Sequence, residues 1–421
     1  MTLSAFLDSS PTAFHGAQTL LSQLQEAGFL LLKEHDAWDL QPGEKYCVAR
    51  RDRGVAAFVV GQQVPWEGGF HLAGAHLDSP AWKAKVEALQ PHHGTWKLPV
   101  EAYGGPIYRT WLDRDLELAG QVCFRHKGEV QTQLWRSGPG FALIPSLAIH
   151  LDRGVNGGAE LNPQDHMNAL LSIPVEDENT NPILQKLCDD LALQEPDILG
   201  TELYLIPSEK AQIQGDSQER ILSGRLDDLA MAHALVQGLV QSKDSPQKTS
   251  MALWFDAEEI GSRTDTGALS PFMDEMMERL VLSAGGGREE LLRSRRHSLL
   301  LSCDMAHAVH PNYEGKHDPR YVPTLGKGPV IKAHAQRKYA TDGVSEAIIK
   351  NIAMNAEVQL QKILSRSDAP CGSTIGPLSQ SLTGVVTVDM GNPIWGMHSA
   401  RETASLQDQE AMIRLLSHYW S

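Results

Sequence analysis

The sequence has few cysteines, and no two of them form a CxxC pair. The five cysteines are spread along the chain as Cys47, Cys123, Cys188, Cys303 and Cys371. An odd, scattered set argues against both a disulfide framework and a thiolate zinc site. Reduced thiols are typical of the cytoplasm, so the cysteines indicate a cytoplasmic protein.

Long apolar runs and an excess of basic charge are also missing. No apolar run approaches the ~18 residues of a membrane span, and the first Lys or Arg is Lys33, so a typical export signal is not expected. The formal net charge of −15 at pH 7 argues against nucleic acid and anionic membranes as partners. An acidic substrate stays open, because a local basic pocket can lie in an acidic protein.

The remaining composition is that of an ordinary globular protein, with 421 residues that are 42% hydrophobic and 21% charged. Strand and helix patterns alternate near the start of the chain and again after Gly224, which predicts an α/β layer structure. Between these parts, glycine and proline are frequent and helical patterns are sparse. We therefore predict a discontinuous α/β domain, 1–86 and 221–421, and an inserted β-rich domain, 87–220.

The elements that matter for the site follow from apolar periodicity and from turn residues. We expect strands at 45–50, 55–60, 70–75, 116–125, 129–135, 250–255, 297–303, 328–333, 358–364 and 385–389. We expect helices at 182–193, 227–241, 272–282, 345–355 and 408–418, and another between Thr12 and Gly28.

Residues 254–262, which read WFDAEEIGS, combine a strand end with a cluster of acids. The expected strand 250–255 ends in Asp256, Glu258 and Glu259. Ligands gather at the carboxyl ends of strands in open α/β sheets. Adjacent glutamates repel unless a cation binds them, and metal-assisted hydrolysis uses one carboxylate as ligand and another as base. The alternative is a solvated acidic turn.

Other expected strands also end in residues that bind metals. The additional candidates at element ends are His76 and Asp78, Asp227, Asp304, and His398. Imidazole and carboxylate together suit zinc, and also cobalt or manganese. Two histidines and three acids are enough for two metals that share a bridging carboxylate. Any one of these residues alone is more often structural or on the surface than catalytic.

Several motifs occur in order along nearly the whole chain. They are residues 74–80 (GAHLDSP), 224–229 (GRLDDL), 256–262 (DAEEIGS), 302–308 (SCDMAHA) and 396–402 (GMHSARE), with 101–106 (EAYGGP) and 113–116 (DRDL) in the expected insert. With these motifs the chain resembles the aspartyl aminopeptidases, a family of dinuclear zinc metallopeptidases. The resemblance implies a zinc-exopeptidase-like three-layer domain with a central mixed sheet. It also implies that 87–220 is a dimerisation domain and that dimers form a tetrahedral homododecamer.

The resemblance further implies a complete set of metal ligands for two zinc ions per subunit, with Co²⁺ or Mn²⁺ as substitutes. Asp227 would bridge the two zinc ions. His76 and Asp304 would complete one site, and Glu259 with His398 the other.

The same resemblance assigns the proton transfers. Glu258 would be the general base for a metal-activated water, and Asp78 would orient His76 from behind. Asp228 and Ala257 stand where many relatives have Asn. Asp228 makes the identity of the bridging aspartate less clear, although the register of the motif favours Asp227.

Residues that contact the substrate are also implied. In segment 327–339, Lys332 would pair with an acidic substrate side chain and Tyr339 would hydrogen-bond it. His166, in 162–168 (NPQDHMN), would reach the active site of a neighbouring subunit and steady the oxyanion, and His307 would lie near the substrate. The alternative for Lys332 is a surface lysine on an edge strand, and both histidines could be ordinary ones.

Together these features predict a zinc aminopeptidase that releases N-terminal Asp or Glu from peptides. One alternative is a broad-specificity metalloaminopeptidase on the same scaffold. Another is a catalytically silent, self-assembling scaffold or cargo receptor. The intact Glu258 and the full ligand set argue against the scaffold, which would not require a base.

Overall fold

The computed structural model describes residues 1–158, 160–175, 177 and 179–421. The chain forms two compact units. The first comprises Met1–Asp78, Ala211–Met397 and Glu402–Ser421, and the second comprises Ser79–Lys210 and His398–Arg401. The second unit overlaps the predicted insert, 87–220, but also takes in a four-residue segment near the C-terminus.

A mixed β-sheet forms the centre of the first unit. Its strands β16, β4, β17 and β21 are parallel neighbours, whereas β3 and β19 pair antiparallel with β16 and β21. The strand order is β1 (Leu30–Leu32), β2 (Lys45–Arg50), β3 (Gly54–Val59), β16 (Thr249–Phe255), β4 (Phe70–His76), β17 (Leu299–Cys303), β21 (Val386–Gly391), β19 (Val330–Ala333) and β20 (Gln361–Leu364).

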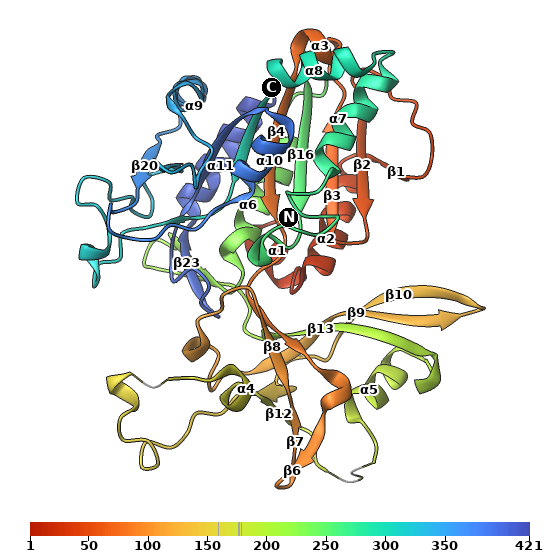
Figure 1. Cartoon of the computed structure of the whole chain (residues 1–421), viewed down its shortest axis with the longest axis vertical. Helices are drawn as coiled ribbons and strands as arrows, with labels where there is room; N and C mark the ends of the chain where they lie inside the picture. Colours follow the sequence, from red (N-terminus) through yellow and green to blue (C-terminus); the bar gives the residue numbers. More distant parts are fainter. Residues whose placement is uncertain (159, 176, 178) are drawn as a thin grey trace. The chain divides into compact units, whose positions relative to one another are not determined.

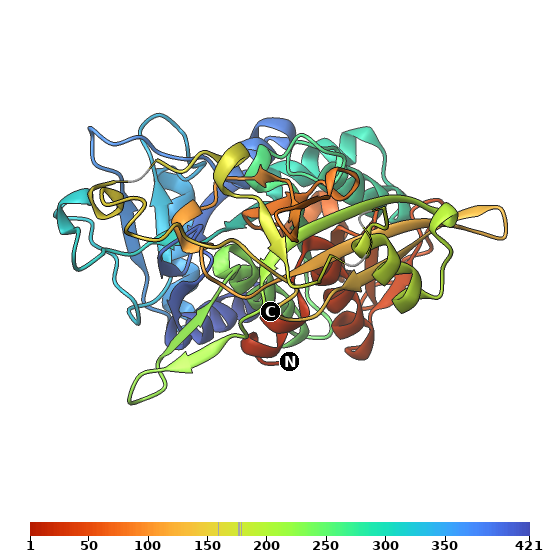
Figure 2. The same ribbon diagram turned by 90° about the horizontal axis from the view of Figure 1, so that it is seen from below.

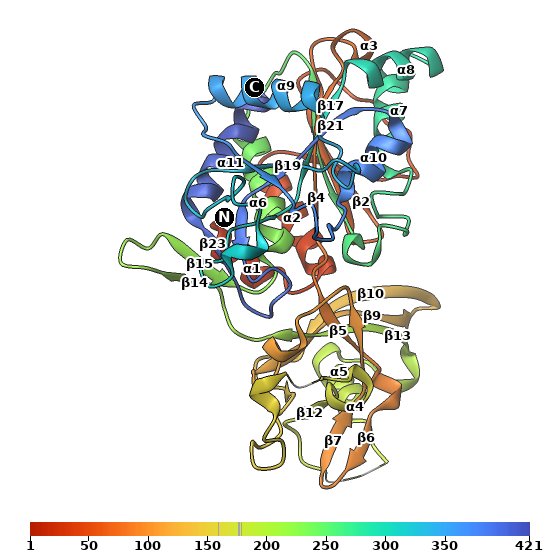
Figure 3. The same cartoon turned by 60° about the vertical axis from the view of Figure 1, so that its left-hand side comes forward.

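Helices cover both faces of this sheet (Figures 1 and 3). One layer holds α1 (Leu3–Ser9), α2 (Ala13–Glu26), α6 (Leu226–Val240), α9 (Gly343–Asn355) and α11 (Leu406–Tyr419). The other holds α3 (Pro65–Gly68), α7 (Phe272–Ser283), α8 (Arg288–His297) and α10 (Ile375–Thr383).

The side chains of β16 show how one apolar strand serves both layers. Ala252 and Trp254 belong to the core cluster on the first face, and Leu253 and Phe255 belong to the cluster on the second. Successive side chains of a strand point to opposite faces, so a strand buried on both sides must be apolar throughout. The predicted three-layer α/β fold with a central mixed sheet is confirmed.

Helix α6 is apolar on nearly all sides, because it packs against the sheet as well as against α1, α2 and α11. Its first turn departs from helical geometry at Asp227 and Asp228. Both carboxylates are buried, which places two acids at the beginning of a core helix.

A smaller sheet also belongs to the first unit. Its order is β14 (Gln212–Gln214), β15 (Arg220–Ser223), β23 (Glu402–Ser405), β22 (Pro393–Trp395) and β18 (Ala306–His307). The β14–β15 ribbon projects from the rest of its unit (Figure 2).

The second unit is rich in strands and has its own core, which contains Trp82, Trp96, Trp111 and Trp135. Its strand order is β6 (Gln90–His92), β7 (Thr95–Leu98), β12 (Ala169–Leu171), β11 (Ala142–Leu143), β9 (Leu116–His126), β13 (Ile198–Pro207), β5 (Ala81–Ala84) and β8 (Val100–Tyr103), with β10 (Glu129–Arg136) paired to β9. Its helices are α4 (Pro163–His166) and α5 (Pro182–Leu191).

Strands β9 and β10, expected from the sequence at 116–125 and 129–135, form a hairpin. His126 pairs with Glu129 at the turn, and the register continues to the pair of Ala119 with Arg136.

In the described part of the chain, no helix combines the length and the apolar character needed to cross a lipid bilayer.

Candidate metal centre

Three adjacent parallel strands of the central sheet bring metal-binding residues to one edge. Strand β4 ends at His76, which pairs with Phe255 at the end of β16. The 3₁₀ helix η5 (Glu258–Ile260) follows β16, and Asp304 follows β17. The carboxyl ends of neighbouring parallel strands lie together, which explains why residues far apart in the sequence meet here.

Within the first unit, the side chains meet in two overlapping groups. The buried residues His76, Asp227, Asp228 and Asp304 each offer a ligand atom within 4.8 Å of the others. His76, Glu258 and Glu259 form a second group with the same spacing. Within the first group, Nε2 of His76 lies 3.5 Å from Oδ1 of Asp227. The first unit alone therefore brings together the predicted base, Glu258, and four of the five predicted ligands, while the fifth, His398, belongs to the second unit.

Asp78 supports both His76 and the glutamate pair. Nδ1 of His76 lies 2.9 Å from the carbonyl oxygen of Asp78 and 3.4 Å from its Oδ1. A proton on Nδ1 that is donated to this carbonyl leaves the lone pair of Nε2 facing Asp227. The Asp78 carboxylate accepts the backbone N–H groups of Glu258 and Glu259, each at 3.1 Å. The nearest contact to His76 is thus the carbonyl of Asp78 rather than its carboxylate.

The two aspartates at the start of α6 have different neighbours. Asp228 accepts the backbone N–H of His76 through Oδ2 at 3.1 Å, while the N–H of Asp227 is donated to Glu402 at 3.1 Å. Oδ1 of Asp228 is buried and has no hydrogen-bond partner among the described residues. Burying a carboxylate oxygen without a hydrogen-bond partner costs free energy, and a nearby cation would offset this cost.

Burial and crowding of like charges shift the acid pKa values upward. Burial raises the pKa of Glu258 to about 8; Asp304 and Asp78 add to this rise, and His76 opposes it. Burial also raises the pKa of Glu259 and of Asp228 well above the usual range. Without a cation, these carboxylates destabilise one another's charged forms.

For His76, burial and the neighbouring charges act on the pKa in opposite directions. Burial lowers the pKa of His76, but the carboxylates of Asp228, Asp227 and Asp78 outweigh it and raise this pKa well above 6.5. The site is therefore short of positive charge. Imidazole and carboxylate oxygens are the donors that zinc accepts, so the residues present fit a zinc centre.

Lys332 is buried beside this centre. It lies on β19, which is flanked by β21 and β20, and its exposed fraction is only 2%. Its Nζ is 3.3 Å from Oδ1 of Asp304, 3.1 Å from the carbonyl oxygen of Met305 and 5.3 Å from the centroid of the Tyr339 ring. The alternative of a surface lysine on an edge strand is wrong.

The other predicted site residues lie in different surroundings. His307 is exposed on β18. His166 is exposed at the end of α4, and its Nδ1 accepts the N–H of Asn162 at 3.0 Å. His398 belongs to the segment that joins the second unit, where its Nδ1 lies 3.1 Å from the carbonyl oxygen of Gly105. The roles of these three histidines stay predictions.

Comparison with known proteins identifies the family. The sequence model described as Aminopeptidase I zinc metalloprotease (M18) matches residues 6–420. The chain belongs to the M18 family. This M18 chain is 39% identical over 420 residues to the probable M18 family aminopeptidase 2 of Ectopseudomonas mendocina (strain ymp), a match that covers 99% of the chain and 96% of the relative. It is a metalloaminopeptidase, and zinc is the metal of its site.

Solved structures of other proteins share the fold. A chain in the cryo-EM structure of the Ape4 and Nbr1 complex superposes with a TM-score of 0.95 at 33% identity, over 99% of this chain and 84% of that one. The structure of the S. cerevisiae mApe1 dodecamer gives a TM-score of 0.86 at 24% identity, over 99% and 95%. The predicted resemblance to the aspartyl aminopeptidase family is confirmed.

Some residues around the site received no role from the sequence. Glu402 lies inside the motif 396–402, but nothing in that motif indicated its contact with the backbone of Asp227. Asp389 ends the predicted strand 385–389, and the same signal that identified Asp304 could have identified it.

Proposed function

We propose that this M18 metalloaminopeptidase releases N-terminal Asp and Glu residues from peptides. The observation that carries the proposal is the buried ammonium group of Lys332, which lies 3.3 Å from Asp304 at the metal centre. An aminopeptidase must place the side chain of the first substrate residue close to its metals. A buried cation there favours an acidic side chain through charge-assisted hydrogen bonds.

Different residues at the metal centre have different proposed roles in the reaction. Bound zinc supplies a Lewis acid that activates water and polarises the scissile carbonyl group. Glu258 takes a proton from the water and returns it to the departing amine. Asp78 keeps Glu258 in place through its backbone N–H. We propose Asp227 as the bridging ligand, His76 and Asp304 for one zinc ion, and Glu259 and His398 for the other.

The direct test is a panel of matched peptides that begin with Asp, Glu, Leu or Lys. We expect kcat/KM for the acidic residues to exceed that for Leu and Lys on the order of 100-fold, which corresponds to ~3 kcal/mol. Similar values for all four peptides would support the broad-specificity alternative instead.

Replacing Lys332 by Met should remove the acidic preference. The methionine keeps the buried volume but cannot pair with a carboxylate, so KM for an Asp peptide should rise at least about tenfold while cleavage of a Leu peptide persists. Zinc content must be measured alongside, because Lys332 also contacts Asp304.

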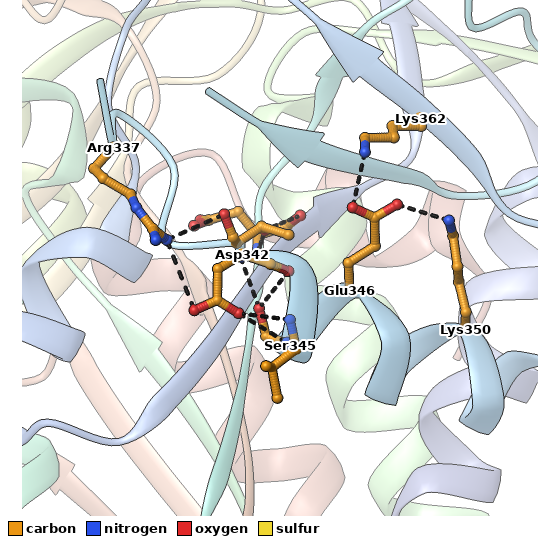
Figure 4. Close-up of polar contacts among 9 residues, drawn as sticks. Arg337, Asp342, Ser345, Glu346, Lys350 and Lys362 are labelled. Carbon is orange, nitrogen blue, oxygen red and sulfur yellow. Dashed lines mark hydrogen bonds and ion pairs between the residues drawn. The ribbon is translucent and has the colours of Figure 1, made fainter. Parts of the chain in front are cut away.

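The matched control for this variant is Lys362→Met on the neighbouring strand β20. Lys362 pairs with Glu346 at 2.8 Å, and Figure 4 shows this pair beside Lys350. We expect the control to leave the substrate preference unchanged. Unchanged KM values on Asp peptides for Lys332→Met would remove Lys332 from the pocket.

We also propose that the second unit mediates dimerisation and that dimers build a tetrahedral homododecamer. Two observations support this assembly. The second unit exposes Leu147, Ile149 and Leu151 with exposed fractions of 62%, 53% and 75%, and a structural neighbour forms a dodecamer. Sedimentation at the mass of a single chain would exclude it.

The proposed assembly links activity to His166, which would act in the active site of a neighbouring subunit. We expect His166→Ala to lower turnover per zinc, whereas His126→Ala, an exposed histidine in the same unit, should not. Co-expression of His166→Ala with Glu258→Gln should restore part of the activity, since mixed assemblies contain sites with both groups intact. Full activity of His166→Ala alone would contradict the link.

We propose a cytoplasmic location for the enzyme. The sequence lacks CxxC pairs, and Cys47 and Cys303 are buried thiols, both as expected in a reducing compartment. Cell fractionation tests this proposal.

A further inference from the structure

A fully buried aspartate lies beside the proposed acid-binding subsite. Asp389, on β21, has an exposed fraction of 0%. It is the direct partner of Lys332 in the antiparallel pairing of β19 with β21. Directly opposed residues place their side chains on the same face of the sheet, so Asp389 and Lys332 are neighbours.

Three donors from separate segments converge on this carboxylate. Oδ1 accepts from Oγ of Ser302 at 2.6 Å and from Oγ1 of Thr374 at 2.5 Å, and Oδ2 accepts from the backbone N–H of Ala340 at 2.5 Å. Hydrogen bonds to a charged acceptor are short and strong. The carboxylate thereby ties β17 and the start of α10 to the residue that follows Tyr339.

The surroundings leave Asp389 little freedom to move. A Cβ atom on Gly376 would come within 2.5 Å of its Oδ1, so only glycine fits at that position. The backbone N–H of Asp389 also donates to Oγ1 of Thr341 at 2.8 Å. Side chain and backbone of one residue therefore hold both Ala340 and Thr341.

Arg337 also holds the loop that contains Ala340 and Thr341. Nη1 of Arg337 donates to the carbonyl oxygens of Ala340 and Thr341 at 3.2 and 3.4 Å and lies 3.9 Å from the Asp342 carboxylate (Figure 4). Asp342 in turn caps α9 through its bonds to the backbone N–H groups of Val344 and Ser345. The Arg337 contacts and the Asp389 contacts together fix the backbone that follows Tyr339.

We infer that Asp389 is a positioning residue of the acid-binding subsite. It holds Lys332 and the Tyr339 ring in the relative position in which they bind an acidic N-terminal side chain. This inference rests on the proposed function. Lys332 faces Asp304 on one side, and Asp304 is a proposed zinc ligand. Asp389 supplies the second acid beside the ammonium group without being part of the metal-binding groups.

The test compares Asp389→Asn with the wild-type enzyme on matched Asp and Leu peptides. Asparagine keeps one acceptor oxygen and replaces the other by a donor, Nδ2. Nδ2 would either face the backbone N–H of Ala340, which is itself a donor, or force the hydroxyl groups of Ser302 and Thr374 to stop donating, so the hold on the loop at Ala340 should weaken. We expect KM for the Asp peptide to rise at least about tenfold, with kcat/KM for the Leu peptide changed less than about twofold and zinc content unchanged.

The control is Asp408→Asn, a carboxylate as buried as Asp389 that accepts the N–H groups of Gly326 and Gly328, both at 2.7 Å. It should leave the ratio of Asp to Leu cleavage unaltered. If Asp389→Asn does not fold, Thr374→Val removes a single donor and should raise KM for the Asp peptide in the same direction, while Thr374→Ser should restore it.

Two failures can be told apart. A wild-type enzyme that cleaves Asp and Leu peptides equally would defeat the proposed function, and this inference with it. A wild-type enzyme that prefers Asp peptides, while Asp389→Asn or Thr374→Val alters both peptides by the same factor or loses zinc, would defeat the inference alone.

Discussion

Glu258→Gln is expected to stop peptide hydrolysis while the protein keeps its zinc. Glutamine has nearly the same shape but cannot accept a proton, so kcat should fall on the order of 10³-fold, within the range that general acid–base groups contribute. The backbone N–H groups of residues 258 and 259 both bond to Asp78, so the substitution leaves the support of the pair intact. Turnover measured together with zinc content checks the prediction.

The neighbouring glutamate provides the matched variant. Glu259 lies in the same turn and is also held by Asp78, but its proposed role is to bind zinc. Glu259→Gln should therefore lose zinc, whereas Glu258→Gln should not. If the two outcomes were exchanged, the roles of the glutamates would be reversed, and if Glu258→Gln kept its turnover, a catalytic base would have to be sought elsewhere.

This pair of glutamates also shows what sequence patterns can predict. The strand expected at 250–255 is β16 (Thr249–Phe255), and the acids follow it directly. Its run of apolar residues is informative because the strand is buried on both faces. Because β16, β4 and β17 are parallel neighbours, residues at their carboxyl ends meet. The strand patterns indicated which residues stand at strand ends, whereas the grouping of these residues around two metals was implied by the resemblance to the aminopeptidases.

Helices α8 and α10 were not predicted, and there is a physical reason for each omission. Helix α8 is strongly charged and buries only Leu291, Ser294 and Arg295, so it has no apolar stripe to recognise. A tertiary contact holds it, the ion pair of Arg295 with Asp274 at 2.6 Å. Helix α10 begins with Ile375, Gly376 and Pro377, which indicate a turn in isolation.

The contacts that support the site escaped prediction for a related reason. Asp389, Glu402 and Asp228 act through contacts with backbone N–H groups of distant segments. No local spacing encodes such contacts, since they depend on the order of strands in the sheet. The sequence also did not indicate that residues 398–401 belong to the second unit, because a segment of four residues is too short to show a change in composition.

The second large effect is expected from the proposed bridging ligand. Asp227→Asn should lose both zinc ions and all measurable activity, because an amide binds zinc poorly and a bridge serves two metals at once. Asp304→Asn, which affects a ligand of one metal only, should retain about one zinc ion per chain. Elemental analysis of purified protein, together with activity, separates these outcomes.

Thermal unfolding adds a readout that does not depend on activity. A ligand that binds only the folded state raises stability, so added zinc should raise the Tm of the metal-free wild-type protein. In Asp227→Asn this increase should vanish, and the metal-free variant should be no less stable than the metal-free wild type, because one charge of a crowded set of buried acids is gone. The control Asp256→Asn alters a buried acid that pairs with Arg53 at 3.5 Å, so it should keep the response to zinc.

Equal zinc content in Asp227→Asn and Asp304→Asn would contradict the proposed bridge. Loss of a bridging ligand should cost more zinc than loss of a ligand that serves one metal, so equal losses would mean that both aspartates bind a single metal.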